Sequence, residues 1–319
     1  MRFAVLSLNP GIDRVLYLGK KLAPGHMNRA VKSVTSQGSK GANTAIMLKR
    51  LGFDVTYYSF SGDAGSRFGR EISPEEGIDC RLTETSCGLR INTKVIDADG
   101  LCSEFNERGG PVTEAEFKRL AQDFLSDPAQ TVFMCGSFPQ GVENTVYKEL
   151  VDVEKSLGRN VVLDCSGEAL TQAVVSSPDV IKPNIDELAD LASSLGLCEH
   201  ISTGCGLSPG DAQALCAKIS SSFGIGRVIC TMGEKGAVEN TGKYSVSAFP
   251  AELRGFSGAG DCFLAGFGAA VYGMGLPDAE AMRFAAACGA AKVALEGTLL
   301  PSAADIEKIL GYLPATIGK

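Results

Sequence analysis

The chain has 319 residues, a formal net charge of −7 and a hydrophobic content of 45%. This length suits one large α/β domain or two small ones, and the hydrophobic content is enough for a sizeable core. The acidic balance without a basic block argues against nucleic acid as a partner, although local cations can still hold phosphate groups. No apolar run reaches the length that spans a membrane, so we expect no membrane partner.

The 11 cysteines are scattered, and none has the CxxC spacing that is typical of zinc sites. Several lie in apolar stretches, which indicates reduced, buried thiols in a cytoplasmic protein. The N-terminal apolar segment is interrupted by Asn9-Pro10-Gly11 too early for a signal peptide. The two histidines, His26 and His200, lie in loop-like segments, which disfavours a Ser-His-Asp hydrolase.

Apolar runs and turn residues predict strands and helices that alternate along the chain. The expected strands are, in order, 3–8, 55–60, 131–135, 160–164, 180–182 and 227–231. The expected helices are 43–51, 143–157, 184–195, 259–273, 278–295 and 302–310. Such alternation predicts an α/β fold in which a mostly parallel central sheet has helices on both faces.

Two stretches do not fit this alternation. Residues 12–34 have an extended pattern, and residues 90–106 alternate around Asp99-Gly100, a dipeptide typical of tight hairpin turns. We expect these strands to form a small β-lid that projects from the main sheet. Because no repeat, linker or low-complexity tract interrupts the chain, residues 1–319 are expected to form a single domain with this lid.

The most informative motif is Gly258-Ala259-Gly260-Asp261, at the start of an apolar helix. Small residues let backbone N–H groups approach an anion, and a helix N-terminus adds partial positive charge. A carboxylate beside such an anion-binding turn is what phosphoryl transfer to a hydroxyl requires. On these four residues alone, an ordinary glycine-rich helix start is an equally good interpretation. The chain has neither a P-loop motif nor a G-x-G-x-x-G after its first strand.

A series of motifs in the same order resembles the PfkB family of ribokinase-like sugar kinases, over nearly the whole chain. The motifs that carry the resemblance are Asn9-Pro10-Gly11-Ile12-Asp13, Gly38-Ser39-Lys40-Gly41-Ala42-Asn43, Gly136-Ser137-Phe138-Pro139-Gln140-Gly141, Asp164-Cys165-Ser166-Gly167-Glu168, Lys182-Pro183-Asn184, Asn184-Ile185-Asp186-Glu187, Thr231-Met232-Gly233-Glu234-Lys235-Gly236-Ala237 and Gly258–Asp261. Two departures are Ser39, where the family has glycine, and Phe256-Ser257, where it usually has Thr/Ser-Val. The resemblance implies a ribokinase-like three-layer sandwich that uses ATP and Mg²⁺.

The resemblance also implies roles for individual residues. Asp261 would act as the base, while the amides of Gly258, Ala259 and Gly260 neutralise charge on the transferred group. The residues expected to bind the sugar are Asp13, Gly38, Lys40, Asn43, Arg90, Asn92, Lys94 and Ser137. The residues expected to bind the nucleotide are Asn184, Thr231, Gly233, Gly236 and Gly260. Glu187 would hold Mg²⁺ through water; a solvated glutamate on a helix face is the alternative interpretation.

The choice of sugar depends on three cations, Lys40, Arg90 and Lys94. The spacing Arg90-x-Asn92-x-Lys94 directs these side chains to one face of a strand, where an arginine and a lysine suit a phosphate monoester. An exposed, charged strand edge is the alternative interpretation.

The cation pattern resembles the phosphosugar branch of the family. We therefore expect an ATP- and Mg²⁺-dependent kinase for a ketohexose monophosphate, with fructose 1-phosphate as the substrate and tagatose 6-phosphate or fructose 6-phosphate as alternatives. From another class, a non-catalytic phosphosugar sensor remains an alternative. The exposed lid sheet would also allow a homodimer.

Overall fold

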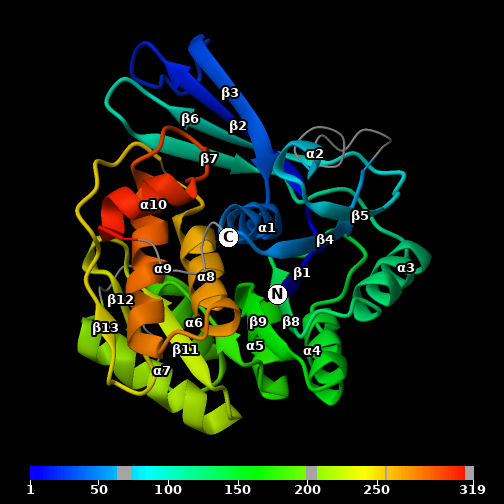
Figure 1. Cartoon of the computed structure of the whole chain (residues 1–319). Helices are drawn as coiled ribbons and strands as arrows, with labels where there is room; N and C mark the ends of the chain where they lie inside the picture. The colour runs from blue at the N-terminus through cyan, green and yellow to red at the C-terminus, as the bar shows by residue number, and fades with distance from the viewer. Residues whose placement is uncertain (63–72, 199–206, 256, 313–319) are drawn as a thin grey trace.

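The computed structural model describes residues 1–62, 73–198, 207–255 and 257–312. Nine strands form the main sheet in the order β13-β12-β11-β10-β9-β8-β1-β4-β5. Figure 1 shows helices packed around this sheet. The strands of this sheet are β1 (Arg2–Ser7), β4 (Asp54–Phe60), β5 (Asp79–Thr83), β8 (Thr131–Cys135), β9 (Asn160–Asp164), β10 (Val180–Ile181), β11 (Arg227–Thr231), β12 (Ala237–Glu239) and β13 (Ser245–Val246). The pairs from β5 to β11 are parallel, and β12 and β13 add antiparallel pairs at one edge.

Helices cover both faces of the main sheet. The helices are α1 (Lys40–Arg50), α2 (Ser73–Glu76), α3 (Glu114–Leu125), α4 (Val146–Ser156), α5 (Gly167–Ala173), α6 (Ile185–Ser194), α7 (Pro209–Phe223), α8 (Ala259–Gly268), α9 (Asp278–Val293) and α10 (Ala303–Leu310). One hydrophobic cluster joins the sheet to α1, α8, α9 and α10, and a second joins it to α3 through α7. The three-layer α/β sandwich predicted from the sequence is confirmed.

The two clusters follow from the two-residue period of the strands. In β1, Phe3 and Val5 belong to one cluster, whereas Ala4 and Leu6 belong to the other. Each central strand is therefore apolar on both sides, which explains why these strands appear in the sequence as continuous apolar runs.

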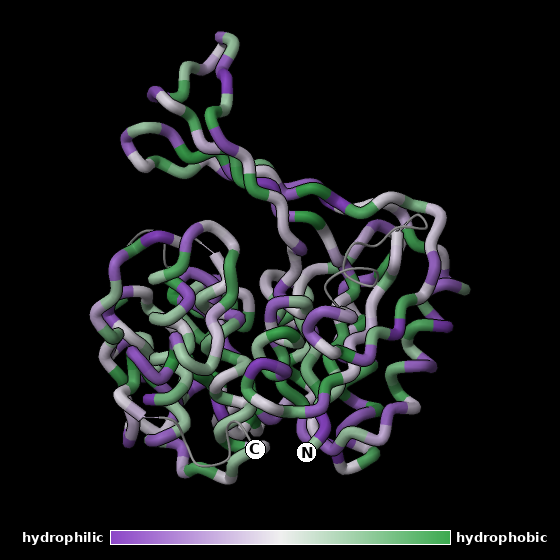
Figure 2. The backbone as a smooth tube through the Cα atoms, turned by 45° about the horizontal axis from the view of Figure 1, so that its top comes forward, coloured by the Kyte–Doolittle hydropathy of each residue, from purple (hydrophilic) through white to green (hydrophobic). Residues whose placement is uncertain are grey.

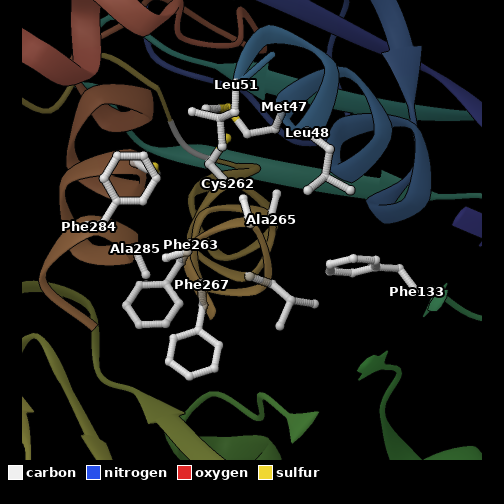
Figure 3. Close-up of a cluster of buried hydrophobic side chains, with 14 of the residues drawn as sticks. Met47, Leu48, Leu51, Phe133, Cys262, Phe263, Ala265, Phe267, Phe284 and Ala285 are labelled. Atoms are coloured by element: carbon white, nitrogen blue, oxygen red, sulfur yellow. The ribbon is translucent and has the colours of Figure 1, made fainter. Parts of the chain in front are cut away.

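Helix α8 lies at the centre of the first cluster. Figure 3 shows its side chains Phe263 and Phe267 among residues from α1, β8 and α9. Every residue of α8 from Asp261 to Gly268 is buried. A Cβ on Gly268 would collide with the Phe133 ring, so glycine permits α8 to lie close against the sheet. The α-helix expected over residues 259–273 ends at Gly268, and Ala269–Gly273 continue it as a π-helical turn.

The second sheet has four strands in the order β3-β2-β6-β7. They are β2 (Gly11–Leu18), β3 (Ala30–Gly38), β6 (Arg90–Ile96) and β7 (Cys102–Asn106). Figure 2 shows this sheet projecting from the body of the molecule, as expected for the β-lid. Strand β3 runs to Gly38, beyond the 12–34 stretch, because its pairing with β2 continues to Gly11. The first two strands of the lid therefore lead almost directly into α1.

Several elements were not anticipated from the sequence, namely α3, α5, α7, β5, β12 and β13. Helices α3 and α7 begin with capping boxes, in which Thr113 pairs with Glu116 and Ser208 with Asp211. This spacing is a recognisable helix-start signal. The short strands β12 and β13 have three and two residues, too few for a periodic pattern. None of the helices that the structure describes combines the length and apolar character needed to cross a membrane.

Candidate active site

The first turn of α8 forms the centre of the site. Gly258 is the N-cap and has a φ of 90°, a left-handed conformation that L side chains rarely adopt. The amides that follow have no partner within the helix at its N-terminus, so this turn presents donors and partial positive charge. Ala259 and Gly260 lie at the start of the helix, and Asp261 follows within the same turn. The motif therefore lies at the N-terminus of a helix, as its residue types predict.

Asp261 is buried at this turn, with 7% of its surface exposed. Asn43, on α1, donates a 2.7 Å hydrogen bond from Nδ2 to Oδ2 of Asp261. Burial raises the pKa of Asp261 above its ordinary value, and the nearby Asp164 carboxylate raises it further. Lys40, the hydrogen bond from Asn43 and Lys182 oppose this rise. A carboxylate with a raised pKa that is oriented by a neighbour is suited to accept a proton.

Two lysines surround a second buried carboxylate, Asp164, at the end of β9. Lys40 Nζ donates to Asp164 Oδ1 at 2.9 Å, and Lys182 Nζ lies 3.8 Å from Oδ2. Burial would raise the pKa of Asp164, but the charges of Lys182 and Lys40 hold it below its ordinary value. Lys40 thus lies in the Asp164 cluster beside the α8 turn, rather than in a cluster with the two lid cations.

Lys182 was not singled out as a site residue in the sequence analysis. It follows β10 and is 5% exposed, and its Nζ lies 3.2 Å from where a Cβ on Gly260 would be. Its ammonium therefore lies beside the first turn of α8. The signal in the sequence was Lys182-Pro183-Asn184, a motif that follows a short apolar strand.

The lid contributes a pair of polar residues from adjacent strands. Asp13 on β2 and Asn92 on β6 are directly opposite in the parallel register, and Asn92 Nδ2 donates to Asp13 Oδ1 at 3.0 Å. Burial raises the pKa of Asp13, against the opposing effects of the Asn92 hydrogen bond and the charges of Lys94 and Arg90. A side chain at Gly38 would collide with the Asp13 carboxylate, so this glycine is required by close approach.

Unsatisfied polar atoms mark the same face of the lid. Arg90 Nε and Asn92 Oδ1 are buried and have no hydrogen-bond partner among the described residues. Lys94 is 6% exposed, and its Nζ lies 3.6 Å from Oε1 of Glu104. Burial lowers the pKa of Arg90. Because buried polar groups are generally satisfied in native proteins, these atoms indicate where a polar ligand would bind.

Ser137 follows β8 and is held by a residue from the first motif. Asn9 Nδ2 donates to Ser137 Oγ at 3.1 Å, and also to the carbonyls of Phe138 and Arg108. Asn9 therefore joins the segment after β8 to the segment after β7. Ser39, the departure from the family pattern, is the N-cap of α1, where its Oγ accepts from Ala42 N at 3.0 Å.

A cavity of about 660 Å³ borders the α8 turn at Ala259 and Gly260. Four of the residues expected at the nucleotide site line it, namely Thr231, Gly233, Gly236 and Gly260. Much of the remaining lining is apolar, including Phe249, Pro250, Leu253 and Phe263. The Gly260 backbone thus borders both the cavity and the Asp261 turn. Phe256 lies outside the described residues.

Asn184 and Glu187 form the capping box of α6. Asn184 N donates to Glu187 Oε2 at 2.9 Å, and Glu187 N donates to Asn184 Oδ1 at 2.8 Å. Glu187 Oε1 also lies 3.7 Å from Lys40 Nζ. The part of the chain that the structure describes has no cluster of three or more histidine, cysteine or acidic side chains able to hold a metal. Glu187 is therefore a single carboxylate near the Asp164 cluster.

Residues 8–305 match the model of the pfkB family carbohydrate kinase. The chain belongs to this family. Among relatives of this pfkB carbohydrate kinase, the 1-phosphofructokinase of Rhodobacter capsulatus is 30% identical over 94% of this chain and 93% of the relative. The 1-phosphofructokinase of Borreliella burgdorferi is 30% identical over 96% and 95%. The structure of phosphofructokinase-2 from Escherichia coli in complex with substrates and products matches with a TM-score of 0.86, 26% identity and coverage of 98% and 99%.

Family membership makes this protein a carbohydrate kinase and implies ATP as the co-substrate. The alternative of a non-catalytic sensor is therefore not retained. The geometry brings Asp261, Asn43, Lys40 and the α8 turn together, and it places the lid pair Asp13 and Asn92 on a separate sheet.

Replacement of Asp261 by asparagine tests the base. Asparagine keeps the shape of the side chain but cannot accept the proton, so kcat should fall by roughly 10²–10⁴ with little change in the KM for either substrate. Steady-state kinetics measures this, and thermal unfolding verifies that the variant is folded. Activity within a few-fold of the parent enzyme would rule out Asp261 as the base.

Replacement of Asn43 by alanine tests the electrostatics of the site. As a base, Asp261 would act in its deprotonated form, so activity would be present above its pKa and lost as the pH falls through it. Because the Asn43 hydrogen bond lowers the pKa of Asp261, Asn43→Ala should move the acid limb of the kcat profile to higher pH. The neighbouring Thr44→Val variant is the control and should leave that limb in place. An unmoved limb in Asn43→Ala would contradict the prediction.

Proposed function

We propose that this carbohydrate kinase transfers the γ-phosphoryl group of ATP to a ketohexose monophosphate, with fructose 1-phosphate as acceptor and fructose 1,6-bisphosphate as product. The observation that carries the proposal is the half-buried Arg90 on the lid, whose buried Nε has no partner among the described residues. A guanidinium with a free donor, on the same face of β6 as Lys94 four residues further along, suits a phosphate monoester that is already present on the acceptor. The names of the curated relatives support the same choice.

The reaction would take place at the first turn of α8. Asp261 accepts the proton of the attacking sugar hydroxyl, and the oxygen attacks the γ-phosphorus as the bond to the leaving ADP oxygen breaks. The amides of Gly258, Ala259 and Gly260 stabilise the negative charge on the transferred group, because they are already oriented before the reaction. Lys182, beside Gly260, adds positive charge to the same turn.

The two substrates would approach this turn from opposite sides. In this proposal Asp13, Gly38, Asn43 and Ser137 bind the sugar hydroxyls, with the Asn92 amide orienting Asp13. On the nucleotide side, Thr231, Gly233, Gly236 and Gly260 surround the base and phosphates in the 660 Å³ cavity. Asn184 does not line this cavity but pairs with Thr231, which does. Lys40 acts indirectly, because it is bound to Asp164.

Mg²⁺ fits a site with a single carboxylate, because this ion keeps several waters and takes its other ligands from phosphates. Glu187 has Oε2 occupied by the α6 cap, while Oε1 faces Lys40 and the Asp164 cluster. We propose that Glu187 holds hydrated Mg²⁺. When bound, the ion would neutralise charge on the nucleotide phosphates.

Fructose 6-phosphate is a second candidate acceptor. A solved structure of the Escherichia coli phosphofructokinase-2 contains fructose-6-phosphate, and its chain matches this one with a TM-score of 0.84 at 26% identity. Tagatose 6-phosphate also carries a phosphate monoester and remains an alternative. Comparison of kcat/KM for these three sugars and free fructose, with ATP and Mg²⁺, distinguishes them. A preference for free fructose would overturn the proposed phosphate contact.

Three further features belong to this proposal. Apolar side chains on the lid sheet and its loops are exposed, namely Met27, Val31, Leu101 and Phe105, and we propose that they pair with the lid of a second copy. Sedimentation equilibrium would report this dimer, and a monomer at all concentrations would exclude it. No disulfide joins the cysteines of the described residues, which supports a cytoplasmic location. The single-domain organisation over residues 1–319 also remains part of the proposal.

Replacement of Arg90 by alanine tests the phosphate contact. A charge-assisted hydrogen bond contributes about 1.5–3 kcal/mol, so kcat/KM for fructose 1-phosphate should fall by roughly tenfold to a hundredfold. Free fructose should be affected much less, and the KM for ATP should not change. Arg14 is exposed on the same lid sheet, so Arg14→Ala is the matched control. Equal losses for fructose 1-phosphate and free fructose would make Arg90 a structural part of the lid.

Replacement of Glu187 by glutamine tests the metal contact. Glutamine can still cap α6 but carries no charge, so the variant should fold normally and require more Mg²⁺ for half-maximal activity. The KM for the sugar should change little. The control is Asp186→Asn, which removes another first-turn acid of α6. Identical Mg²⁺ titrations for the parent and Glu187→Gln would show that Glu187 only caps the helix.

A further inference from the structure

Lys292 is a buried lysine that has no role in the site described above. It lies in the last turn of α9 and has 1% of its surface exposed. Two other buried lysines have a carboxylate nearby: Lys94 faces Glu104, and Lys182 faces Asp164. Lys292 instead donates from Nζ to the backbone carbonyl of Gly297 at 2.9 Å. A buried ammonium is costly without partners, so its retention in this position calls for a reason.

The ammonium lies where two backbone segments meet. A Cβ built on Gly255 would lie 2.5 Å from Lys292 Nζ, 2.6 Å from the Leu295 carbonyl and 3.0 Å from the Gly297 carbonyl. The amides of Arg254 and Gly255 both donate to the Val293 carbonyl, at 2.8 and 3.1 Å. The segment that leads into α8 is therefore fastened to the end of α9, with the lysine nitrogen at the junction.

The stem of the same lysine contacts the turn that begins α8. A Cβ on Gly258 would lie 3.4 Å from Lys292 Cε, and also 3.4 Å from Nδ2 of Asn43. Asn43 Nδ2 is the group that donates to Asp261. Gly258 is thus enclosed between the side chain that orients the proposed base and the side chain that fixes the preceding segment.

We propose that Lys292 is a positioning residue for phosphoryl transfer. Its ammonium binds the Gly297 carbonyl beside Gly255, its stem supports the Gly258 turn, and its charge lies behind the amides that would receive the transferred group. The inference rests on the proposed function of that turn. Lys292 acts through the turn and not by contact with the substrate.

Replacement of Lys292 by methionine tests this role. Methionine fills a similar volume without charge or donors, so kcat should fall by about tenfold to a hundredfold, somewhat less than the 10²–10³ that follows loss of a direct donor. The KM values for ATP and sugar should stay within about threefold of the parent values, because no substrate contact is lost. Thermal stability should be unchanged or higher, since an apolar side chain is easily accommodated in place of a buried charge.

A purely structural lysine gives the opposite pattern. The thermal midpoint would fall, while kcat per folded molecule stayed at the parent value, and this result would overturn the proposal. Lys308→Met is the control: it removes a positive charge from an exposed position on α10 and should leave kcat unchanged. If Lys292→Met does not fold, Lys292→Ala is assayed with n-butylammonium chloride against sodium chloride at equal ionic strength. A saturable recovery of kcat supports the proposal, and an unchanged kcat counts against it.

The result can be separated from the proposed function itself. A parent enzyme that phosphorylates none of the phosphosugars would refute the proposed function. A parent enzyme that is active, with a Lys292→Met variant of equal kcat, would refute only the role of Lys292.

Discussion

The constraint on which the site depends is the burial of helix α8. A helix that is apolar all round has no freedom to rotate or slide, because each face is packed against α1, α9 or the sheet. Its first turn is therefore held in one place, with Gly258 in a conformation that few other residues could adopt. The same burial takes Asp261 out of water and raises its pKa. Packing thus determines both the position of the carboxylate and its affinity for a proton.

The charges at the ends of the parallel strands are balanced against one another. Asp164 ends β9, Lys182 follows β10, and Lys40 begins the helix that leads away from the lid. The two lysines keep Asp164 ionised although it is buried, and its negative charge in turn raises the pKa of Asp261. Because these groups come from four separate segments, removal of one would change the protonation of the others. The cluster is best regarded as one electrostatic unit.

The sequence predicted the layers and the main sheet well, because buried parallel strands are continuous apolar runs with clear ends. It predicted the lid from alternation and from Asp99-Gly100. Short strands such as β13 carry too little pattern to be recognised. Helix α3 begins with a recognisable signal in the sequence, the capping box formed by Thr113 and Glu116.

Within the site, motifs identified residues but not their partners. Lys40 and Asp164 are 124 positions apart, and nothing in their spacing shows that they form an ion pair. The expectation that Lys40 would lie with Arg90 and Lys94 came from charge alone, which contains no information on distance. Lys292 shows the same limit. A lysine in an alanine-rich helix is expected on the solvated face, and only the structure shows that this lysine is buried.

In the proposed function the 660 Å³ cavity holds the nucleotide, and its lining then has a consequence for the choice of phosphate donor. Among the described residues that surround it, Thr231 and Glu234 are the polar side chains, and the others are apolar side chains or glycines. Purine bases differ from one another in their exocyclic amino and carbonyl groups, which only hydrogen bonds can distinguish. A pocket that offers mainly apolar contact recognises the flat shape of the ring, and discrimination between adenine and guanine then depends on backbone groups of the same loops. Changes to these side chains should therefore alter the affinity for purine nucleotides as a class more than the ratio between them.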